Sequence, residues 1–298
     1  MSTDRDRPKG SGNRASASQP RGVQRIIEPR TVLEGAGVRL KRSIAGPDLD
    51  YLDPFLLFDH FGSDNPDDYL AGFPMHPHRG IETVTYMLAG EVRHKDSLGN
   101  AGTIGAGDVQ WMTAGGGIMH EEMPAAREGE MAGFQLWVNL PARLKMTRPR
   151  YQEIAAAQIP VVKREGGVRI LVIAGAVDGI QGPVTEIAAD PTYMDVTVGP
   201  GSSFNQPVPR GQAAFAYVFA GQGLFGGSEQ SISHPKLVVF GDGDLVEVRA
   251  EGEAVRFLLV SGKPLNEPIA RYGPFVMNTA QEIQQALQDL KDGTFVRS

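Results

Sequence analysis

Two short segments of the chain hold histidine and glutamate residues at a spacing that suits a metal site. They are MHPHRGIE, residues 75–82, and GGGIMHEEMP, residues 115–124. In an extended strand, side chains two residues apart point to the same face, so His76 and His78 project together, and so do His120 and Glu122. Glu82 shares the parity of His76 and His78 and is a second candidate for the carboxylate. If the two pairs face each other inside a barrel, they bring together three imidazoles and one carboxylate.

Such a donor set favours one divalent transition metal. The chain has no cysteine, which excludes thiolate zinc sites, iron–sulfur clusters, disulfides and cysteine nucleophiles. Imidazole and carboxylate donors suit Fe(II), Mn, Co, Ni, Cu or Zn, and four protein ligands on an octahedral ion leave two positions for a substrate or O₂. The expected site therefore supports either catalysis or sensing.

The glycines before His120 have two interpretations. Residues 115–117 could form an anion-binding nest, but neither the lysine nor the helix of a phosphate loop follows them, so a tight turn that delivers His120 inward is favoured. The HEEMP run is not an HExxH zinc helix, because the second histidine is absent and Pro124 would interrupt the helix. By strand alternation, Glu121 should face away from the site.

The other histidines and the large aromatic residues have ordinary explanations. His60, His94 and His234 occur singly, and we expect them to be solvated or hydrogen-bonded. Four aromatic residues near the clusters could line a flat substrate pocket, but at strand positions such residues more often belong to the core. These four are Phe55, Phe58, Trp111 and Trp137.

Short strands must position these residues. Gly (37) and Pro (21) make up almost a fifth of the chain, and brief apolar runs separated by turns extend over residues 26–141 and again over 161–262. YMLAG at 86–90 matches YVFAG at 217–221 at an offset of 131 residues, and GAGD at 105–108 matches GDGD at 241–244 at an offset of 136. A tandem duplication explains both matches. We expect an all-β fold of two tandem jelly-roll (double-stranded β-helix) barrels.

The domain boundaries follow from this pattern. Residues 1–24 have little to bury and should form a disordered tail. Residues 25–155 should form the metal-binding barrel, and 156–298 a metal-free barrel, because Pro207 and Pro209 occupy the duplicated positions of His76 and His78. A capping box, TAQE at 279–282, followed by apolar residues at helical spacing predicts a short C-terminal helix within the second domain.

Charge and hydropathy limit the partners. The net charge is -6, and residues 1–25 hold six Lys/Arg against two Asp, which gives +4 there and -10 for the rest. An acidic body without a basic stripe argues against direct binding of nucleic acid. There is no apolar run long enough to span a bilayer and no secretory leader, so we expect no membrane association and a cytoplasmic location.

Several blocks of the sequence resemble the signatures of the pirin family. They are HPHRGIETVTYMLAGEVRHKDSLGN, GDVQWMTAGGGIMHEEMP, FQLWVNL and GPFVMNT. The resemblance implies a bicupin fold, with two cupin barrels, whose N-terminal domain holds one metal ion, usually iron as Fe(II), through His76, His78, His120 and Glu122. It also implies that Glu82 lies outside the ligand set, where it would accept a hydrogen bond from a ligand histidine or a neighbouring group.

The resemblance suggests two functions from different classes. The first is a metal-dependent dioxygenase of the quercetin 2,3-dioxygenase type, which opens an aromatic flavonol with O₂ and releases carbon monoxide. Glu122 would then be a catalytic residue as well as a ligand, because it could take the flavonol hydroxyl proton. The second is an iron-dependent regulatory protein that acts through a protein partner, as a transcriptional co-regulator or a modulator of a metabolic enzyme. A metal that only stabilises the barrel is a third, weaker interpretation.

Overall fold

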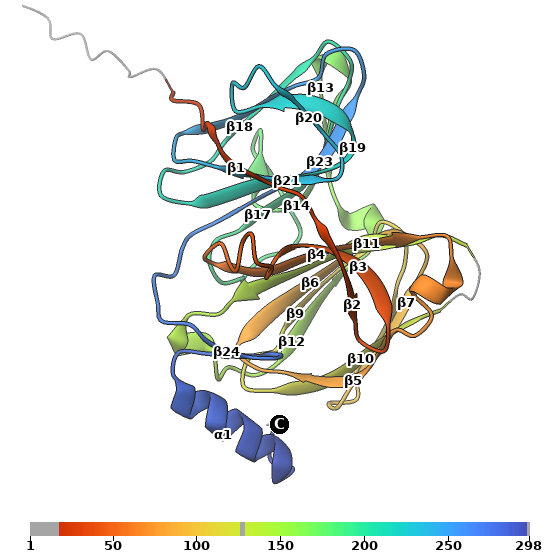
Figure 1. The fold of residues 1–298 in the computed structure, drawn as a ribbon, viewed down its shortest axis with the longest axis vertical. Helices are drawn as coiled ribbons and strands as arrows, with labels where there is room; N and C mark the ends of the chain where they lie inside the picture. The colour runs from red at the N-terminus through yellow and green to blue at the C-terminus, as the bar shows by residue number, and fades with distance from the viewer. Residues whose placement is uncertain (1–17, 126–128, 297–298) are drawn as a thin grey trace, which may run out of the picture.

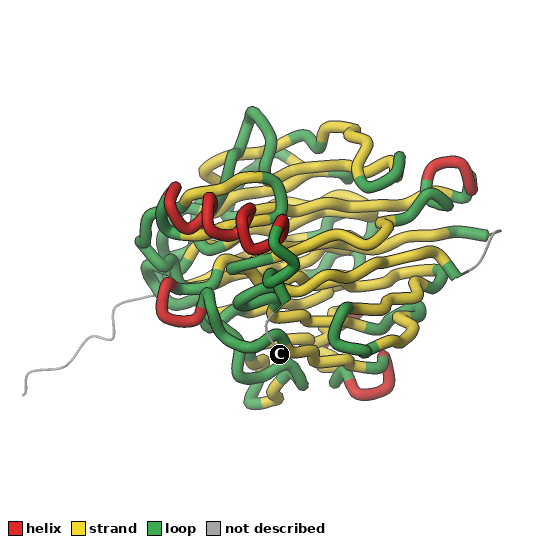
Figure 2. Tube along the Cα trace, turned by 90° about the horizontal axis from the view of Figure 1, so that it is seen from below, coloured by secondary structure: helices red, strands yellow, loops and turns green. Residues whose placement is uncertain are grey.

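Two β-barrels, one above the other in Figure 1, make up most of the molecule. The computed structural model describes residues 18–125 and 129–296. Seen from below, strands fill the middle of the molecule, the one long helix crosses in front of part of them, and the short helical turns lie at the edges (Figure 2). Within the described residues, no helix is long and apolar enough to cross a membrane.

The N-terminal barrel consists of two facing antiparallel sheets. The larger sheet has the order β12-β9-β6-β11-β4-β3-β2, and the smaller one has the order β5-β10-β7-β8. The strands of the larger sheet are β2 (Arg30–Glu34), β3 (Val38–Ile44), β4 (Phe55–Ser63), β6 (Ile81–Ala89), β9 (Val109–Thr113), β11 (Met131–Asn139) and β12 (Arg150–Ile154). Those of the smaller sheet are β5 (Phe73–His78), β7 (Val92–Asp96), β8 (Ala101–Ile104) and β10 (Ile118–Pro124). Both predicted histidine clusters lie in the smaller sheet.

The C-terminal barrel is formed by one sheet that folds back on itself, because the long β19 pairs with strands at both of its ends. Its strands are β1 (Val23–Ile27), β13 (Val161–Arg164), β14 (Val168–Ala174), β17 (Thr192–Val198), β18 (Ser203–Pro207), β19 (Ala213–Phe225), β20 (Ser231–Ser233), β21 (Lys236–Phe240), β22 (Leu245–Arg249) and β23 (Val255–Gly262). The remaining elements are β15 (Ala176–Val177), β16 (Ile180–Gln181), β24 (Ala270–Tyr272), β25 (Phe275–Met277), α1 (Ala280–Lys291) and the 3₁₀ turns η1 (Pro66–Asp68), η2 (Ala142–Leu144), η3 (Ala156–Gln158) and η4 (Glu165–Gly167). The expected all-β fold with one C-terminal helix is confirmed.

The two barrels share a hydrophobic core. Phe58 from β4 packs against Phe215 and Tyr217 from β19, with ring centroids 5.5 and 4.8 Å apart. A buried polar link crosses the same interface, where the Tyr86 hydroxyl donates to Asp195 Oδ2 at 2.7 Å. Phe55 and Trp111 also belong to this core, so these aromatic residues stabilise the interface rather than line a pocket. The larger sheet of the N-terminal barrel and the sheet of the C-terminal barrel therefore stabilise each other.

The two ends of the chain pack on barrels other than those expected. β1 pairs with β21 of the C-terminal sheet, and Arg21, almost fully buried, donates to the carbonyl oxygens of Pro209, Gln212 and Gly241. Residues 18–24 are therefore ordered against the second barrel, which corrects the tail predicted for 1–24 and the N-terminal domain predicted to start at 25. The part of that tail within residues 1–17 lies outside the described residues.

The C-terminal helix also departs from the expected domain organisation. Its predicted capping box is present, because Thr279 Oγ1 accepts from the Glu282 amide. However, β25 and α1 pack on the N-terminal barrel and not on the C-terminal barrel. Figure 1 shows α1 at the end of the molecule where β5 and β10 lie. The domain predicted for residues 156–298 therefore ends in a segment that packs on the N-terminal barrel. A local pattern reveals the helix but carries no information about which distant surface it covers.

The duplication is present, but one of its two sequence matches pairs turns that are not equivalent. β6 and β19 are both central strands, which fits the 131-residue offset. In the N-terminal barrel, the GAGD turn leads into β9, which pairs with the central strand β6. In the C-terminal barrel, the strand that pairs with β19 in the corresponding way is β21, but the GDGD turn comes after β21 and leads into β22. The second match therefore compares different turns of the two barrels.

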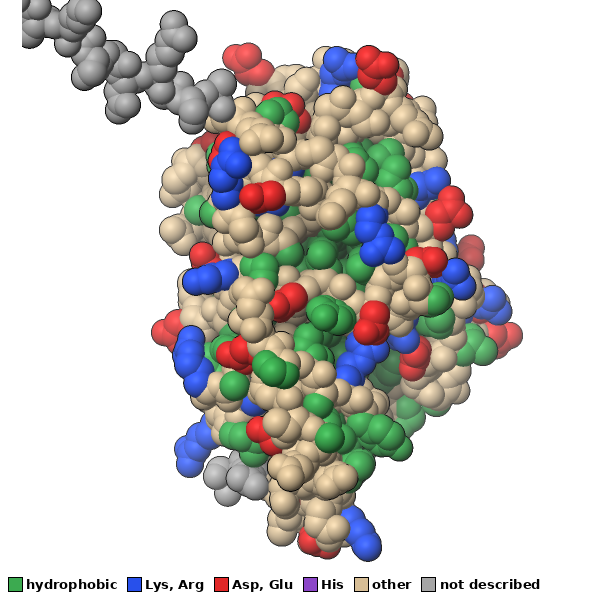
Figure 3. All heavy atoms as spheres, turned by 60° about the vertical axis from the view of Figure 1, so that its left-hand side comes forward, with side chains coloured by type: hydrophobic (Ala, Val, Ile, Leu, Met, Phe, Trp, Pro, Cys, Tyr) green, Lys and Arg blue, Asp and Glu red, His purple; other side chains and the backbone are tan. Residues whose placement is uncertain are grey.

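The interior of the C-terminal barrel is apolar where the N-terminal one holds histidines. β18 and β22 pair in the same way as β5 and β10, and they direct Phe204, Val246 and Val248 into the core. On the face of the molecule drawn in Figure 3, acidic and basic side chains are interspersed.

Candidate metal centre

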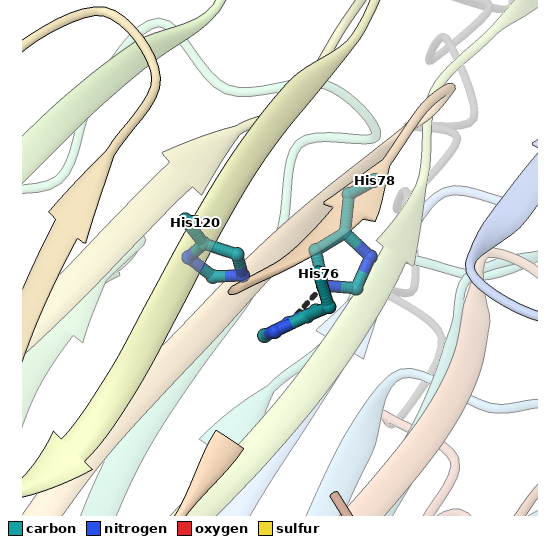
Figure 4. Close-up of side chains that lie close together, drawn as sticks. All are labelled: His76, His78 and His120. Atoms are coloured by element: carbon teal, nitrogen blue, oxygen red, sulfur yellow. Dashed lines mark hydrogen bonds between the residues drawn. The ribbon is translucent and has the colours of Figure 1, made fainter. Parts of the chain in front are cut away.

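The histidines come together because β5 and β10 are antiparallel neighbours. His76 lies directly opposite His120, and His78 lies opposite Ile118. The turn before β10 needs glycine, since Gly117 has a φ of 138° and a Cβ there would lie 2.4 Å from the Phe295 carbonyl oxygen. The glycine run is thus a turn that leads into β10, as the sequence indicated. Figure 4 shows the three imidazoles converging from the two strands.

The geometry of the three imidazoles fits a single metal ion. Ring nitrogens of His76, His78 and His120 lie within 4.8 Å of one another, and the Nε2 atoms of His76 and His78 are 3.1 Å apart. Two nitrogens at right angles on one ion, each at about 2.1 Å, are separated by about 3 Å. His76 Nδ1 is 2.9 Å from the Pro74 carbonyl oxygen, to which it donates as the N–H tautomer, and this leaves the Nε2 lone pair for a metal.

Burial keeps His78 and His120 neutral, which is the form in which histidine binds metal. Burial, and secondarily the neighbouring His76 and His94, lower the pKa of His120 to about 3. Burial also lowers the pKa of His78 well below its usual value. Among the described residues, neither ring nitrogen of His120 has a hydrogen-bond partner, which is costly for a buried polar group. A metal ion would bind the lone pair on the unprotonated ring nitrogen of His120. The three imidazoles therefore fit the divalent metal ion that the sequence predicts.

Glu122 lies next to the histidines but is held from the opposite sheet. It belongs to the same strand as His120, and the register between β10 and β5 shifts between these two residues. Its Oε1 atom accepts from the Thr85 hydroxyl at 3.0 Å, across the barrel on β6. Glu122 is not part of the group of ligand atoms within 4.8 Å of one another. The structure brings it to the site, and its role as a ligand stays a prediction.

Glu82 faces away from the histidines and is not part of their group of ligand atoms, and of the two kinds of donor that the resemblance allowed, it is a neighbouring group that donates to it. It shares a face of β6 with Val84 and Tyr86, both of which belong to the core between the barrels. Its Oε1 atom accepts from Thr113 at 2.9 Å, and burial raises the pKa of its carboxyl group. The parity that links it to His78 is broken by the turn at Gly80, after which the chain enters the other sheet.

His76 and His78 open onto an apolar cavity of about 660 Å³. Its wall includes His76, His78 and Glu122, together with Trp137, whose ring meets that of His78 edge-on at 5.1 Å. Of the four aromatic residues considered from the sequence, Trp137 is the one that lines the cavity. Residues that sequence reasoning missed complete the wall, among them Leu57, Phe61, Phe73, Thr85, Met131 and Gln135. A cavity of this size and polarity is typical of sites for small organic ligands.

Two of the three carboxylates in the cavity wall are already paired. Arg42 donates to both oxygens of Asp59, at 2.9 and 2.7 Å, and to Glu34 at 2.6 Å. The third carboxylate in the wall is Glu122, whose described partner is a neutral hydroxyl. Glu122 is therefore the acid in this wall with the most freedom to act as a base or a ligand.

The C-terminal segment buttresses the strand that holds His78. The next residue, Arg79, is almost fully buried, and it donates to Asp289 Oδ2 at 2.7 Å and to the Phe295 carbonyl oxygen at 3.1 Å. Lys145 Nζ donates to the carbonyl oxygens of Gly80 and Val276, which ties the same turn to β25. The position of His78 thus depends on residues about 200 positions away in the sequence.

His60, His234 and Glu121 behave as their positions in the sequence indicated, whereas His94 is buried next to a carboxylate and is not solvated. His60 Nδ1 lies 3.0 Å from the Tyr217 hydroxyl, and His234 Nδ1 lies 3.2 Å from the Gly221 carbonyl oxygen. His94 Nε2 is 2.8 Å from Glu153 Oε1. Glu121 points outward and pairs with Lys95 at 2.9 Å.

Comparisons with known proteins agree with this fold. The Pirin family model matches residues 37–138, and the model of the Pirin C-terminal cupin domain matches residues 193–296. The chain belongs to the pirin family. The predicted resemblance and the two-cupin fold are confirmed, and the pirin family model on the N-terminal side spans both histidine clusters.

Pirin relatives resemble the chain over almost its whole length. A pirin-like protein of Caulobacter vibrioides is 47% identical over 92% of this chain and 99% of its own. A Pseudomonas aeruginosa protein with the provisional name quercetin 2,3-dioxygenase is 47% identical over 87% of this chain and 93% of its own. A crystal structure of quercetin 2,3-dioxygenase from Acinetobacter baumannii is 36% identical, with a TM-score of 0.85, and the match covers 93% of this chain and 98% of that one.

Proposed function

We propose that this pirin is a metal-dependent dioxygenase that cleaves flavonols in the manner of quercetin 2,3-dioxygenase. The observation that carries the proposal is the position of His76 and His78 in the wall of an open, mostly apolar cavity. A metal with a purely structural role is normally enclosed by its ligands, whereas a catalytic one keeps access to substrate. The names of the Pseudomonas and Acinetobacter relatives support the same reaction.

His76, His78 and His120 would hold one divalent ion, with Fe(II) as the proposed metal, and Glu122 would complete the donor set. The ion, when bound, supplies a site for O₂ and for the deprotonated flavonol. The cavity wall would position the flat substrate through Trp137 and the apolar side chains around it, and it would exclude water. The reaction consumes one flavonol and one O₂, and it yields the ring-opened ester and one carbon monoxide.

Glu122 would accept the proton of the flavonol hydroxyl at its carboxylate. Asp59 and Glu34 are engaged with Arg42, which leaves Glu122 as the acid in the wall best placed for general-base catalysis. Flavonol deprotonation should therefore depend on Glu122, and the Glu122→Gln variant should lose turnover.

The experiment is a quercetin assay with iron-loaded protein under air and under argon. We expect loss of the flavonol absorption band under air alone, and no loss in the His76→Gln variant. An iron-loaded protein that does not consume quercetin in an O₂-dependent manner would overturn the proposal. The regulatory function, the protein partner, the absence of nucleic-acid binding and the compartment stay predictions.

A further inference from the structure

A hydrogen-bond chain outside the predicted site leads from the larger sheet to the Glu122 carboxylate. The Thr85 hydroxyl is 3.0 Å from Glu122 Oε1 and 2.7 Å from Gln135 Oε1. Thr85 and Gln135 lie directly opposite each other on β6 and β11, and both line the cavity. Thr85 and Gln135, which form this series of hydrogen bonds, therefore belong to central strands of the barrel and not to a loop.

The number of protons that each group can donate shows which group is the donor in each of these two hydrogen bonds. A threonine hydroxyl has one proton to donate, so it cannot donate to both the carboxylate and an amide oxygen. Glu122 has no proton to give when ionised, whereas Gln135 has an NH₂ group that donates once its amide is turned toward Thr85. Gln135 then donates to Thr85, and Thr85 donates to Glu122.

We propose that Thr85, itself oriented by Gln135, is a positioning residue that fixes the Glu122 carboxylate for metal binding. The hydroxyl engages Oε1 and leaves Oε2 for the ion. Thr85 is almost fully buried, so water does not readily replace its hydroxyl. Without this hydrogen bond, the carboxylate would have to be ordered by the metal alone, and the affinity for the metal would fall. This inference rests on the proposed role of Glu122 as a ligand.

Isosteric substitutions on β6 test the inference. Thr85→Val removes the hydroxyl and keeps the shape, Thr85→Ser keeps the hydroxyl, and Thr83→Val makes the same change two residues earlier at an equally buried position. Cobalt(II) is the probe, because its visible absorption reports both binding and coordination. Loss of a group that orients a ligand typically weakens metal affinity by about 10- to 100-fold.

We expect Thr85→Val to raise the cobalt dissociation constant by about 10- to 100-fold and to change the visible spectrum. Thr85→Ser and Thr83→Val should stay close to the unsubstituted protein. In the Glu122→Gln background, Thr85→Val should add no further loss, because the two residues act through the same bond.

The Glu122→Gln variant separates the two levels of the proposal. If it binds cobalt as tightly as the unsubstituted protein, Glu122 is not a ligand, and the donor set of the proposed function is wrong. If it binds more weakly but Thr85→Val does not, the positioning inference alone is overturned. An equal loss in Thr85→Val and Thr83→Val would also overturn it, since the effect would then be one of packing.

Discussion

Acidification of the metal-free protein should destabilise it through His120. Burial lowers the pKa of His120 to about 3 in the folded protein, whereas histidine in an unfolded chain titrates near its ordinary value of 6.5. The unfolded chain therefore binds the proton first, and the folded state loses relative stability as the pH falls from about 6.5 toward 3. Above pH 6.5 His120 is neutral in both the folded and the unfolded state, so its titration no longer changes the unfolding free energy.

The size of this effect follows from the difference in pKa. Each pH unit between the two values corresponds to about 1.4 kcal/mol, so at pH 5 the contribution of His120 is about 2 kcal/mol. The assay is urea unfolding of chelator-treated protein at pH 7.5 and pH 5.0. Glutamine cannot take up the proton, so His120→Gln should show a loss of unfolding free energy on acidification that is smaller by about 2 kcal/mol.

A control keeps this measurement specific. His234 is exposed, and the His234→Gln variant should show the pH dependence of the unsubstituted protein. If His120→Gln and the unsubstituted protein lose the same free energy between the two pH values, His120 is not held neutral by burial, and the electrostatic argument for the site is wrong.

Three further predictions concern the cavity, the C-terminal buttress and the interface between barrels. Trp137→Leu should raise KM for quercetin about three- to tenfold with little change in kcat, because an aromatic contact contributes about 0.5–1.5 kcal/mol; an unchanged KM would place the substrate elsewhere. Asp289→Asn leaves the buried Arg79 without its countercharge, so amide exchange in α1 should accelerate roughly a hundredfold while β6 stays protected, and equal protection of α1 in both proteins would contradict this. Phe58→Ala should lower the unfolding free energy by about 3–5 kcal/mol in a denaturant titration, and a loss below about 1 kcal/mol would mean that the shared core is unimportant.

Strand parity identified the histidines because it holds within an unbroken strand. Alternation along β5 puts the side chains of His76 and His78 on one face, and the register of β10 against β5, with His120 opposite His76, puts His120 on the same face. Parity failed for Glu82 because a tight turn separates it from β5 and moves it to another sheet. A local rule cannot show where one strand ends and the next begins.

Contacts between distant segments account for the other differences. From the sequence, alternation with Val84 and Tyr86 along β6 shows only that Thr85 points to the opposite face of the strand. Its contact with Glu122 could not be predicted, because it depends on how the two sheets of the barrel face each other. The pairing of β1 with β21 and the packing of α1 on the N-terminal barrel join the two ends of the chain to the barrel more distant in sequence. Neither the sequence of β1 nor that of α1 contains a pattern that indicates which barrel it packs on.

Metal analysis tests the central claim most directly. Protein prepared without a histidine tag, incubated with Fe(II) without oxygen and then desalted, should retain one iron per chain by mass spectrometric elemental analysis. The triple variant His76→Gln/His78→Gln/His120→Gln should retain none above background, while His234→Gln should retain one. A triple variant that still holds one iron per chain, or an unsubstituted protein that holds none, would contradict the assignment of these three histidines as the metal centre.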